Sequence, residues 1–181
     1  MSVERFDIEG LALIKTKKFT DERGYFFESY NEQKLNELLG LDLHFVQDNV
    51  SMSNKGVVRG LHLQAPPFAQ GKLVRVLSGK VIDVAVDIRK NSPTYGKHVA
   101  VELSAENGLQ FWIPEGFAHG FSVLEDNTLF SYKCTNYYQP SAEMGVHVGD
   151  VALNIDWQIK KLIINQKDDM LPILTNFATP F

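Results

Sequence analysis

The chain has 181 residues, 44% of them apolar, and a formal net charge of −4. This length suits one well-buried domain over residues 1–181 and is short for two. The charge gives no general attraction to nucleic acid or to an anionic membrane, and no apolar run approaches the roughly 20 residues of a membrane helix. Because the N-terminus has no signal segment and Cys134 is the single cysteine, we expect a soluble cytoplasmic protein without disulfides.

The first 40 residues predict two strands and one helix. Residues 8–18 alternate like a strand, with Leu11 and Leu13 on one face. A turn at residues 21–24 leads to an aromatic strand over 25–30. Residues 31–40 predict a helix that begins after the cap residue Asn31 and ends at Gly40. This helix is expected to cover the core without taking part in chemistry.

From residue 44 the pattern is typical of short strands separated by turns. In residues 80–88 the alternation is clean, with Ile82, Val84, Val86 and Ile88 on one face. Regularly spaced short strands predict an all-β sandwich or barrel. In the tail, residues 159–165 favour a strand or an irregular apolar run, and residues 165–169 a polar turn. The strand-like segments are 44–53, 56–64, 71–79, 80–89, 97–104, 108–114, 120–124 and 128–138.

Polar side chains interrupt the strand-like stretch 47–79. They are Gln47, Asn49, Arg59, His62, Lys72 and Arg75. Such groups do not improve a core, whereas inside a cavity they would line a polar ligand site. Taken alone, a histidine is more often a structural hydrogen-bonder, and a strand lysine often extends its charge to the surface.

Residues 108–121 resemble the second conserved motif of the cupin superfamily, a double-stranded β-helix or jelly roll. Gly108, Pro114, Gly116 and His119 have that motif's spacing, although Val123 replaces its usual Asn. In metal-binding cupins the first motif supplies two His and a Glu. Here His62 is followed by Gln64, and Lys72 stands where the Glu is expected. A protonated lysine has no lone pair for a metal, so the resemblance implies a cupin jelly roll without metal.

A more specific resemblance covers nearly the whole chain. The segments FTDERGYFFES, QDNVSMSNKGVVRGLHLQ, QGKLVRVLSGKVIDVAVDIR, SPTYGKH, IPEGFAHGF, YKCTNYY and KDDMLPIL closely resemble the dTDP-4-dehydrorhamnose 3,5-epimerase family. The resemblance implies inversion of C3 and C5 of dTDP-4-dehydro-6-deoxy-D-glucose, giving dTDP-4-dehydro-L-rhamnose for polysaccharide biosynthesis. It implies no metal and no redox cofactor.

By motif position, the resemblance gives four residues catalytic roles. His62 would be the base that removes the proton next to the C4 ketone, a role suited to neutral imidazole. Asp168 would orient His62, although Asp169 is adjacent and an exposed turn carboxylate is the structural alternative. Lys72 would stabilise the enolate oxygen, and Tyr132 would return the proton to the other face.

The resemblance also implies the nucleotide site. Arg23 and Arg59 match diphosphate-binding arginines, whose guanidinium groups suit phosphate oxygens. Phe26 and Tyr138 would enclose the thymine ring. A homodimer that exchanges N-terminal strands is expected, so that one subunit completes its partner's site. The remaining substrate contacts would be Glu28, Gln47, Asn49 and His119.

One expectation concerns local geometry. Arg59 and His62 are three residues apart, so a regular strand would point them to opposite faces. If both line one pocket, the strand must be interrupted, and Gly60 permits a bulge there. The sequence therefore predicts a local break at Gly60.

Other functions remain open at this stage. Within the fold, the alternatives are a single-carbon epimerase or a 3,4-ketoisomerase on a similar sugar. A metal-dependent dioxygenase would need ligands that Gln64 and Lys72 do not supply. A non-catalytic nucleotide-binding protein would have no need for His62, Lys72 and Tyr132 together. Phe68 and Gly71 depart from the family's usual His and Ala, which leaves the sugar preference open.

Overall fold

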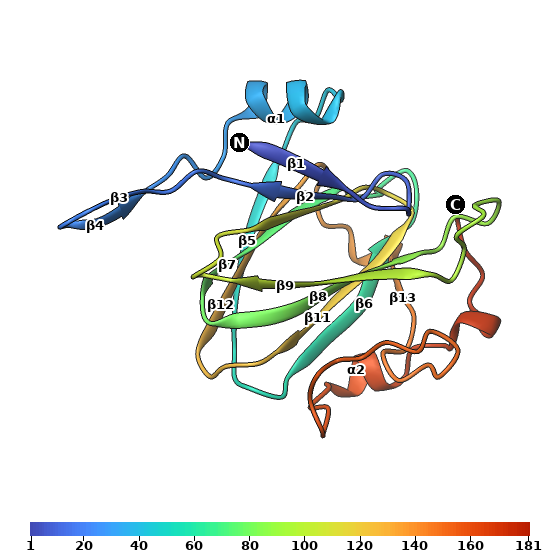
Figure 1. Ribbon diagram of the computed structural model, residues 1–181. Coiled ribbons are helices and arrows are strands. Elements are labelled where there is room, and N and C mark those ends of the chain that lie inside the picture. The colour runs from blue at the N-terminus through green and yellow to red at the C-terminus, as the bar shows by residue number, and fades with distance from the viewer.

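Two antiparallel β-sheets face each other in the computed structural model, which describes residues 1–181 (Figure 1). The six-stranded sheet has the order β1-β2-β10-β7-β12-β5, and the five-stranded sheet has the order β13-β6-β11-β8-β9. The strands of the first sheet are β1 (Ser2–Arg5), β2 (Ala12–Lys15), β10 (Gln110–Ile113), β7 (Lys72–Ser78), β12 (Thr128–Cys134) and β5 (Gln47–Ser53). Those of the second are β13 (Glu143–Gly145), β6 (Val58–Gln64), β11 (Phe117–Val123), β8 (Lys80–Asp87) and β9 (His98–Ser104).

Apolar side chains fill three layers. The layer between the sheets includes Phe111 and Phe130, both almost fully buried. The outer face of the six-stranded sheet is covered by helix α1 (Glu32–Leu39), which buries Leu35 and Leu39. The outer face of the five-stranded sheet is covered by the C-terminal segment. Each sheet is therefore buried on both faces along much of its area, which keeps the strands that carry the site rigid.

Strand β8 shows how this layering follows from the sequence. Ile82, Val84 and Val86 pack against the C-terminal segment, whereas Val81 and Ala85 face the space between the sheets. The predicted alternation is confirmed, and both faces are buried because each meets a different layer. The carboxylate of Asp83 consequently points between the sheets and is fully buried.

Helix α1 agrees closely with its prediction. Asn31 caps it by accepting a 3.0 Å hydrogen bond from the Lys34 amide. Gly40 ends it in the left-handed conformation, with φ of 71°. The amphipathic pattern therefore located both ends of this helix.

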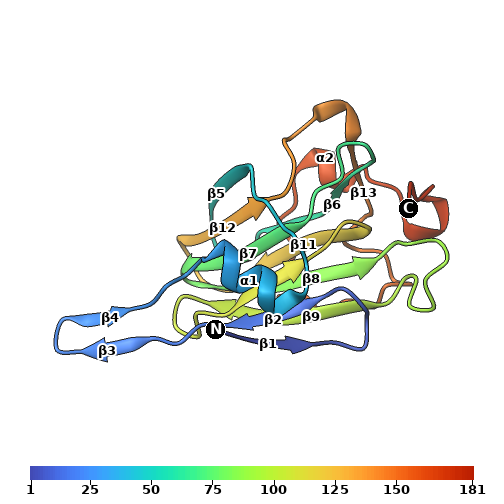
Figure 2. The same ribbon diagram turned by 90° about the horizontal axis from the view of Figure 1, so that it is seen from above.

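The N-terminal hairpin of β3 (Phe19–Asp21) and β4 (Gly24–Phe26) projects away from the two sheets in both views (Figures 1 and 2). Phe19, Tyr25 and Phe26 are all exposed there, Phe26 by 71%. The strand predicted over 25–30 ends at Phe26, and that predicted over 8–18 is limited to 12–15. Within one chain, all three rings therefore remain more than half exposed.

The C-terminal part corrects one prediction. Residues 165–169 contain the short helix α2 (Gln166–Asp169) where a polar turn was expected. Asn165 caps it by accepting a 2.7 Å hydrogen bond from the Asp168 amide. Residues 159–165 are irregular apart from a single bridge between Ile163 and Val57. The short 3₁₀ turns are Pro140–Ala142 and Leu174–Asn176. No helix is long and apolar enough to cross a membrane.

Candidate active site

Two adjoining cavities open between the sheets, with volumes of about 300 and 270 Å³. They share four wall residues: Asn49, His62, Lys72 and Tyr132. We call the first the Tyr138 cavity; its other polar wall residues are Gln47, Gln64, Gln70, Tyr138 and Glu143. We call the second the Asp168 cavity; its other polar wall residues are Ser51, Arg59, His119, Asn165 and Asp168. The shared residues stand where the two cavities meet.

His62 and Asp168 form the central pair. His62 Nε2 lies 2.8 Å from Asp168 Oδ1, and the Gly60 amide donates to Asp168 Oδ2 at 3.3 Å. Burial favours the protonated carboxyl, but the His62 hydrogen bond and charge and the Gly60 amide outweigh it, so the pKa of Asp168 is lowered. An ionised carboxylate only accepts, so Nε2 of His62 carries the proton. Nδ1 of neutral His62 is then free to take a proton from a substrate.

The alternative of an exposed turn carboxylate at Asp168 is wrong, because only 1% of this residue is exposed. The neighbouring Asp169 has 67% of its side chain exposed and lies 3.6 Å from His147. The cap of helix α2 turns Asp168 inward and Asp169 outward. Tertiary structure thus separates two carboxylates that the sequence could not tell apart.

A β-bulge at Gly60 brings Arg59 and His62 to the same cavity. His119 pairs with His62 and Phe121 with Arg59, so two steps along β11 match three along β6. A Cβ on Gly60, whose φ is +131°, would lie 2.5 Å from the Gly120 Cα, so no other residue fits without displacement. The predicted local break is confirmed, and it lies within a continuous strand β6.

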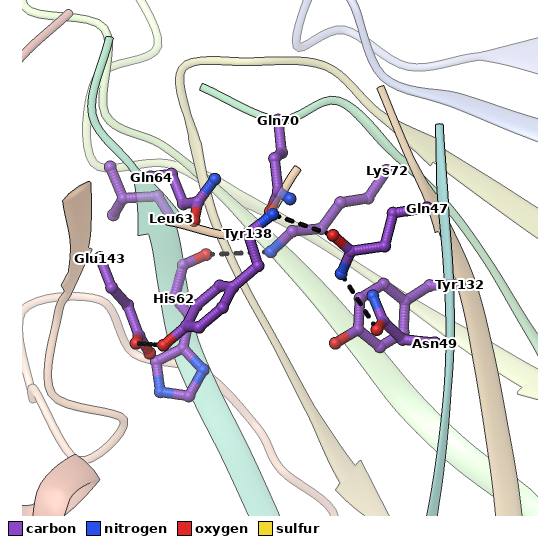
Figure 3. A pocket seen from close by; sticks show the side chains of 10 residues that line it. All are labelled: Gln47, Asn49, His62, Leu63, Gln64, Gln70, Lys72, Tyr132, Tyr138 and Glu143. Atoms are coloured by element: carbon purple, nitrogen blue, oxygen red, sulfur yellow. Dashed lines mark hydrogen bonds between the residues drawn. The ribbon is translucent and has the colours of Figure 1, made fainter. Parts of the chain in front are cut away.

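Lys72 and Tyr132 come from the opposite sheet. Lys72 Nζ donates to the His62 carbonyl at 3.4 Å, and burial lowers the pKa of this lysine. Tyr132 makes no side-chain hydrogen bond, and burial raises its pKa. Figure 3 shows Tyr132 across the Tyr138 cavity from His62. A base, a cation and a phenol therefore surround one space.

Tyr138 and Glu143 edge the Tyr138 cavity. The Tyr138 hydroxyl donates to Glu143 Oε2 at 2.6 Å (Figure 3). Lys167 Nζ donates to the same oxygen, also at 2.6 Å. Gln47 accepts from the Tyr138 amide at 2.9 Å and donates to Asn49 at 3.1 Å. The Tyr138 ring is half exposed, so its position is fixed while its face remains available.

His119 and Asp83 form a second histidine–carboxylate pair. His119 Nε2 lies 3.1 and 3.0 Å from the two Asp83 oxygens. Only 7% of His119 is exposed, and burial lowers its pKa, so the ring is neutral near pH 7. His119 lines the Asp168 cavity together with Lys72.

Three nucleotide-site residues predicted from the sequence lie elsewhere in this chain. Arg23 and Phe26 belong to the projecting hairpin, where Arg23 binds Asp21 and has 84% of its side chain exposed. Glu28 forms an ion pair with Lys34 at 2.8 Å. One chain therefore does not bring Phe26 and Tyr138 together. Arg59 does line the Asp168 cavity, where its Nε donates to Ser53 at 3.0 Å.

Sequence reasoning missed Gln70, Asp83, Glu143, Asn165 and Lys167 as site or supporting residues. Asn165 had a usable signal, because Asn before a short polar run favours a helix cap. Glu143 had none, since its strand is three residues long. Gln64 was considered only as a replaced metal ligand. It instead joins two loops, bonding the Phe68 and Tyr137 carbonyls and the Gln139 amide at 2.6, 3.1 and 2.7 Å.

The sequence and the fold match known proteins of one family. The family model described as dTDP-4-dehydrorhamnose 3,5-epimerase matches residues 5–176. The enzyme of that name from Salmonella typhimurium is 53% identical over 96% of both chains. The Legionella pneumophila dTDP-6-deoxy-D-glucose-3,5-epimerase, solved in complex with dTDP-4-keto-L-rhamnose, is 49% identical over 98% of this chain and 94% of its own, with a TM-score of 0.94.

A more distant structure distinguishes the alternatives within the fold. The 3′-monoepimerase of Streptomyces bikiniensis, solved with dTDP-quinovose, has a TM-score of 0.89 but 29% identity, over 94% of this chain and 86% of its own. The fold is therefore shared by one-carbon and two-carbon enzymes, and sequence identity favours the two-carbon enzymes. Together these matches show that the chain belongs to the dTDP-4-dehydrorhamnose 3,5-epimerase family.

Proposed function

We propose that His62, Lys72 and Tyr132 carry out the family's reaction, the inversion of C3 and C5 in dTDP-4-dehydro-6-deoxy-D-glucose to give dTDP-4-dehydro-L-rhamnose. The observation that carries the proposal is the His62–Asp168 pair, with Tyr132 across the cavity and Lys72 beside both. A binding protein would not need an oriented base opposite a phenol. The activity itself follows from the family and its near-full-length relatives.

The first step is removal of a proton from carbon next to the C4 ketone. Nδ1 of His62 takes the proton from C3 or C5, and the C–H electron pair moves into an enolate with negative charge on the ketone oxygen. Asp168 stabilises the imidazolium that forms, because its carboxylate accepts the Nε2 proton. General-base catalysis by such a group contributes about 10²- to 10⁴-fold.

Lys72 stabilises the enolate. A fixed cation next to the developing oxygen charge contributes several kcal/mol in a site from which water is excluded. Lys72 is partly buried and comes from a strand whose backbone pairs on both sides, with β10 and β12. Its ammonium group therefore needs little reorganisation when the charge forms.

Tyr132 completes the inversion. Its hydroxyl protonates the enolate carbon from the face opposite His62, and solvent then restores the phenol and the neutral imidazole. Burial raises the pKa of Tyr132, so the phenol holds its proton until the strongly basic enolate carbon appears. Repeating the sequence at the second carbon gives the doubly inverted product.

Deuterium incorporation from D₂O tests these roles. In the wild type, we expect deuterium at C3 and C5 of the product by proton NMR. His62→Ala should abolish exchange at both carbons. Tyr132→Phe should permit exchange with retained configuration, because the base remains and the opposite acid is lost. Exchange at a single carbon would indicate a one-carbon epimerase. An unchanged rate in His62→Ala would refute the assigned base.

We further propose a homodimer in which the β3–β4 hairpin of each subunit completes its partner's nucleotide site. Arg23 and Phe26 are exposed on that hairpin, and the Tyr138 ring is half exposed at the cavity. A partner's Phe26 and Arg23 would supply the second face for the thymine ring and a second phosphate contact, as expected from the sequence. From the same chain, the nucleotide would be bound by Arg59, Gln47, Asn49 and Tyr138. Glu28 would be a further contact. We propose the cytoplasm as the compartment of the protein.

Mixed dimers test this arrangement. A subunit carrying His62→Ala and one carrying Arg23→Ala with Phe26→Ala should each be weakly active alone. After subunit exchange, one site in each mixed dimer has both an intact base and an intact hairpin, so roughly a quarter of wild-type activity should return. No recovery in dimers shown to be mixed would refute hairpin exchange, and a monomer by sedimentation would refute the dimer.

A further inference from the structure

Asp83 is a buried carboxylate close to the reacting groups that the mechanism above does not use. It lies on β8, is fully buried, and bonds His119 Nε2 through both oxygens at 3.1 and 3.0 Å. His119 and Lys72 line the same cavity. A buried carboxylate is costly unless charge and hydrogen bonds compensate it, and neutral His119 offers only a hydrogen bond.

Several titratable groups surround Lys72. His62 and Arg59 from β6, His119 from β11, Tyr132 from β12, Glu143 from β13 and Asp168 from α2 line the same cavities as Lys72. Asp83 from β8 and Cys134 from β12 lie near enough to act on its charge. Burial raises the pKa of Cys134, which leaves a neutral thiol near pH 7. Burial likewise raises the pKa of Tyr132. Neither side chain supplies negative charge.

Glu143 is negative but is already neutralised. Lys167 Nζ lies 2.6 Å from its Oε2, and the Tyr138 hydroxyl donates to the same oxygen. Arg59 is bonded to Ser53 and is exposed. Asp83 and Asp168 are therefore the carboxylates near Lys72 that are bonded to a histidine and not to a lysine or arginine, and of the two only Asp83 has no role in the mechanism above.

We propose that Asp83 is a positioning residue for the epimerase reaction: it keeps the partly buried Lys72 cationic and holds His119 with its Nε2–H directed away from the substrate. The proposal rests on the role given above to Lys72. The Nε2–H of His119 is committed to a carboxylate that only accepts, so its Nδ1 is a bare acceptor. Burial lowers the pKa of Lys72, whereas Asp83 is among the negative groups that oppose this shift. Without the Asp83 charge, Lys72 should lose its proton at a lower pH.

The test is the pH profile of kcat/KM in Asp83→Asn, compared with a matched control. Asparagine keeps the shape of the side chain and removes its charge. Asp87→Asn is the control, because Asp87 is also a fully buried carboxylate of β8 but bonds Arg89, Ser92 and Thr94 instead. We expect the alkaline limit of activity in Asp83→Asn to move to lower pH than in the wild type, because a negative charge near the Lys72 ammonium group is lost. Asp87→Asn should lower stability and leave that limit unchanged.

Two results would overturn the proposal. One is an Asp83→Asn enzyme whose alkaline limit equals that of the wild type. The other is equal displacement in Asp87→Asn, which would indicate a general effect of lost stability. A wild type without exchange at C3 and C5 would instead refute the proposed function, which is thereby tested separately.

A measurement on the wild type covers the case in which Asp83→Asn fails to fold. Nitrogen-15 NMR of histidine-labelled protein reports the tautomer of each ring. We expect His119 to remain neutral with its proton on Nε2 between about pH 7 and 9, because burial lowers its pKa from the ordinary histidine value. A proton on Nδ1, or a titration of His119 within that range, would contradict the assigned orientation.

Discussion

Replacing Asp168 by Asn tests the central pair most directly. Asp168 has two acceptor oxygens, one bonded to His62 Nε2 at 2.8 Å and one to the Gly60 amide at 3.3 Å. Asparagine offers one oxygen and an NH₂ group. If its oxygen stays on Gly60, the NH₂ group meets His62 Nε2 and favours the tautomer with a proton on Nδ1. If it turns to His62, the buried Gly60 amide loses its partner.

The size of the effect follows from the bond that is lost. A hydrogen bond to a charged group contributes about 1.5–3 kcal/mol, and each 1.36 kcal/mol of activation free energy is tenfold in rate. The loss in kcat should therefore be about 10- to 150-fold. The unfavourable tautomer would add to this loss, because it places a proton on the nitrogen that must act as the base. KM should change little, since only 1% of Asp168 is exposed and both of its oxygens already bond groups of the protein.

The assay is the initial rate of deuterium incorporation at C3 and C5, followed by proton NMR at saturating substrate. Asp169→Asn is the matched control, because it removes the adjacent, exposed carboxylate of the same helix. Its rate should remain within a factor of about two of the wild type, the range typical of surface substitutions. An Asp168→Asn enzyme as fast as Asp169→Asn would refute the reasoning.

Three other perturbations have defined outcomes. Gly60→Ala should destabilise the protein by several kcal/mol in urea unfolding, because its Cβ would lie 2.5 Å from the Gly120 Cα. The control is Gly24→Ala, which has a φ of +121° but open space around it and should cost only about 1–3 kcal/mol. Equal losses in the two variants would contradict the argument that the backbones approach too closely at Gly60. The hydrogen bonds to Asp87 outweigh its burial and lower its pKa to about 2. Its contribution of about 2 kcal/mol to the free energy of unfolding should therefore be complete above about pH 4 and be lost as pH falls toward 2. An Asp87→Asn protein whose unfolding depends on acid in the same way as that of the wild type would contradict this. Arg59→Gln should weaken dTDP binding in calorimetry about 10- to 150-fold if the guanidinium contacts the diphosphate, whereas an unchanged Kd would place that contact elsewhere.

Local patterns in the sequence determined much of the fold. The alternation over 80–88, the caps Asn31 and Gly40, and the regular turns gave the strands, the helix and the all-β class. These features depend on neighbours along the chain, whose periodicity is visible in sequence. The break at Gly60 was predictable for the same reason. Arg59 and His62 are three residues apart, so a regular strand would place them on opposite faces.

The chemistry of the site was reached in part through family motifs. His62, Lys72 and Tyr132 were assigned by position, and the structure places them around one space. The choice of Asp168 over Asp169 needed tertiary structure, because a single capped turn of helix decides which carboxylate is buried. The sequence predicted a polar turn there.

The sequence could not identify Asp83 or Glu143 as neighbours of Lys72, nor show that the hairpin bearing Arg23 and Phe26 lies apart from Tyr138 within one chain. Strand alternation predicts which face a side chain occupies but not which strand lies opposite it. That opposition is decided by how β6, β8 and β11 of one sheet face β7 and β12 of the other. The sequence by itself therefore determined the all-β class, most of the longer strands, helix α1 and the family of this protein. Only the tertiary structure decided which groups stabilise each buried charge, because those groups are far apart in the chain and come into contact only in the folded protein.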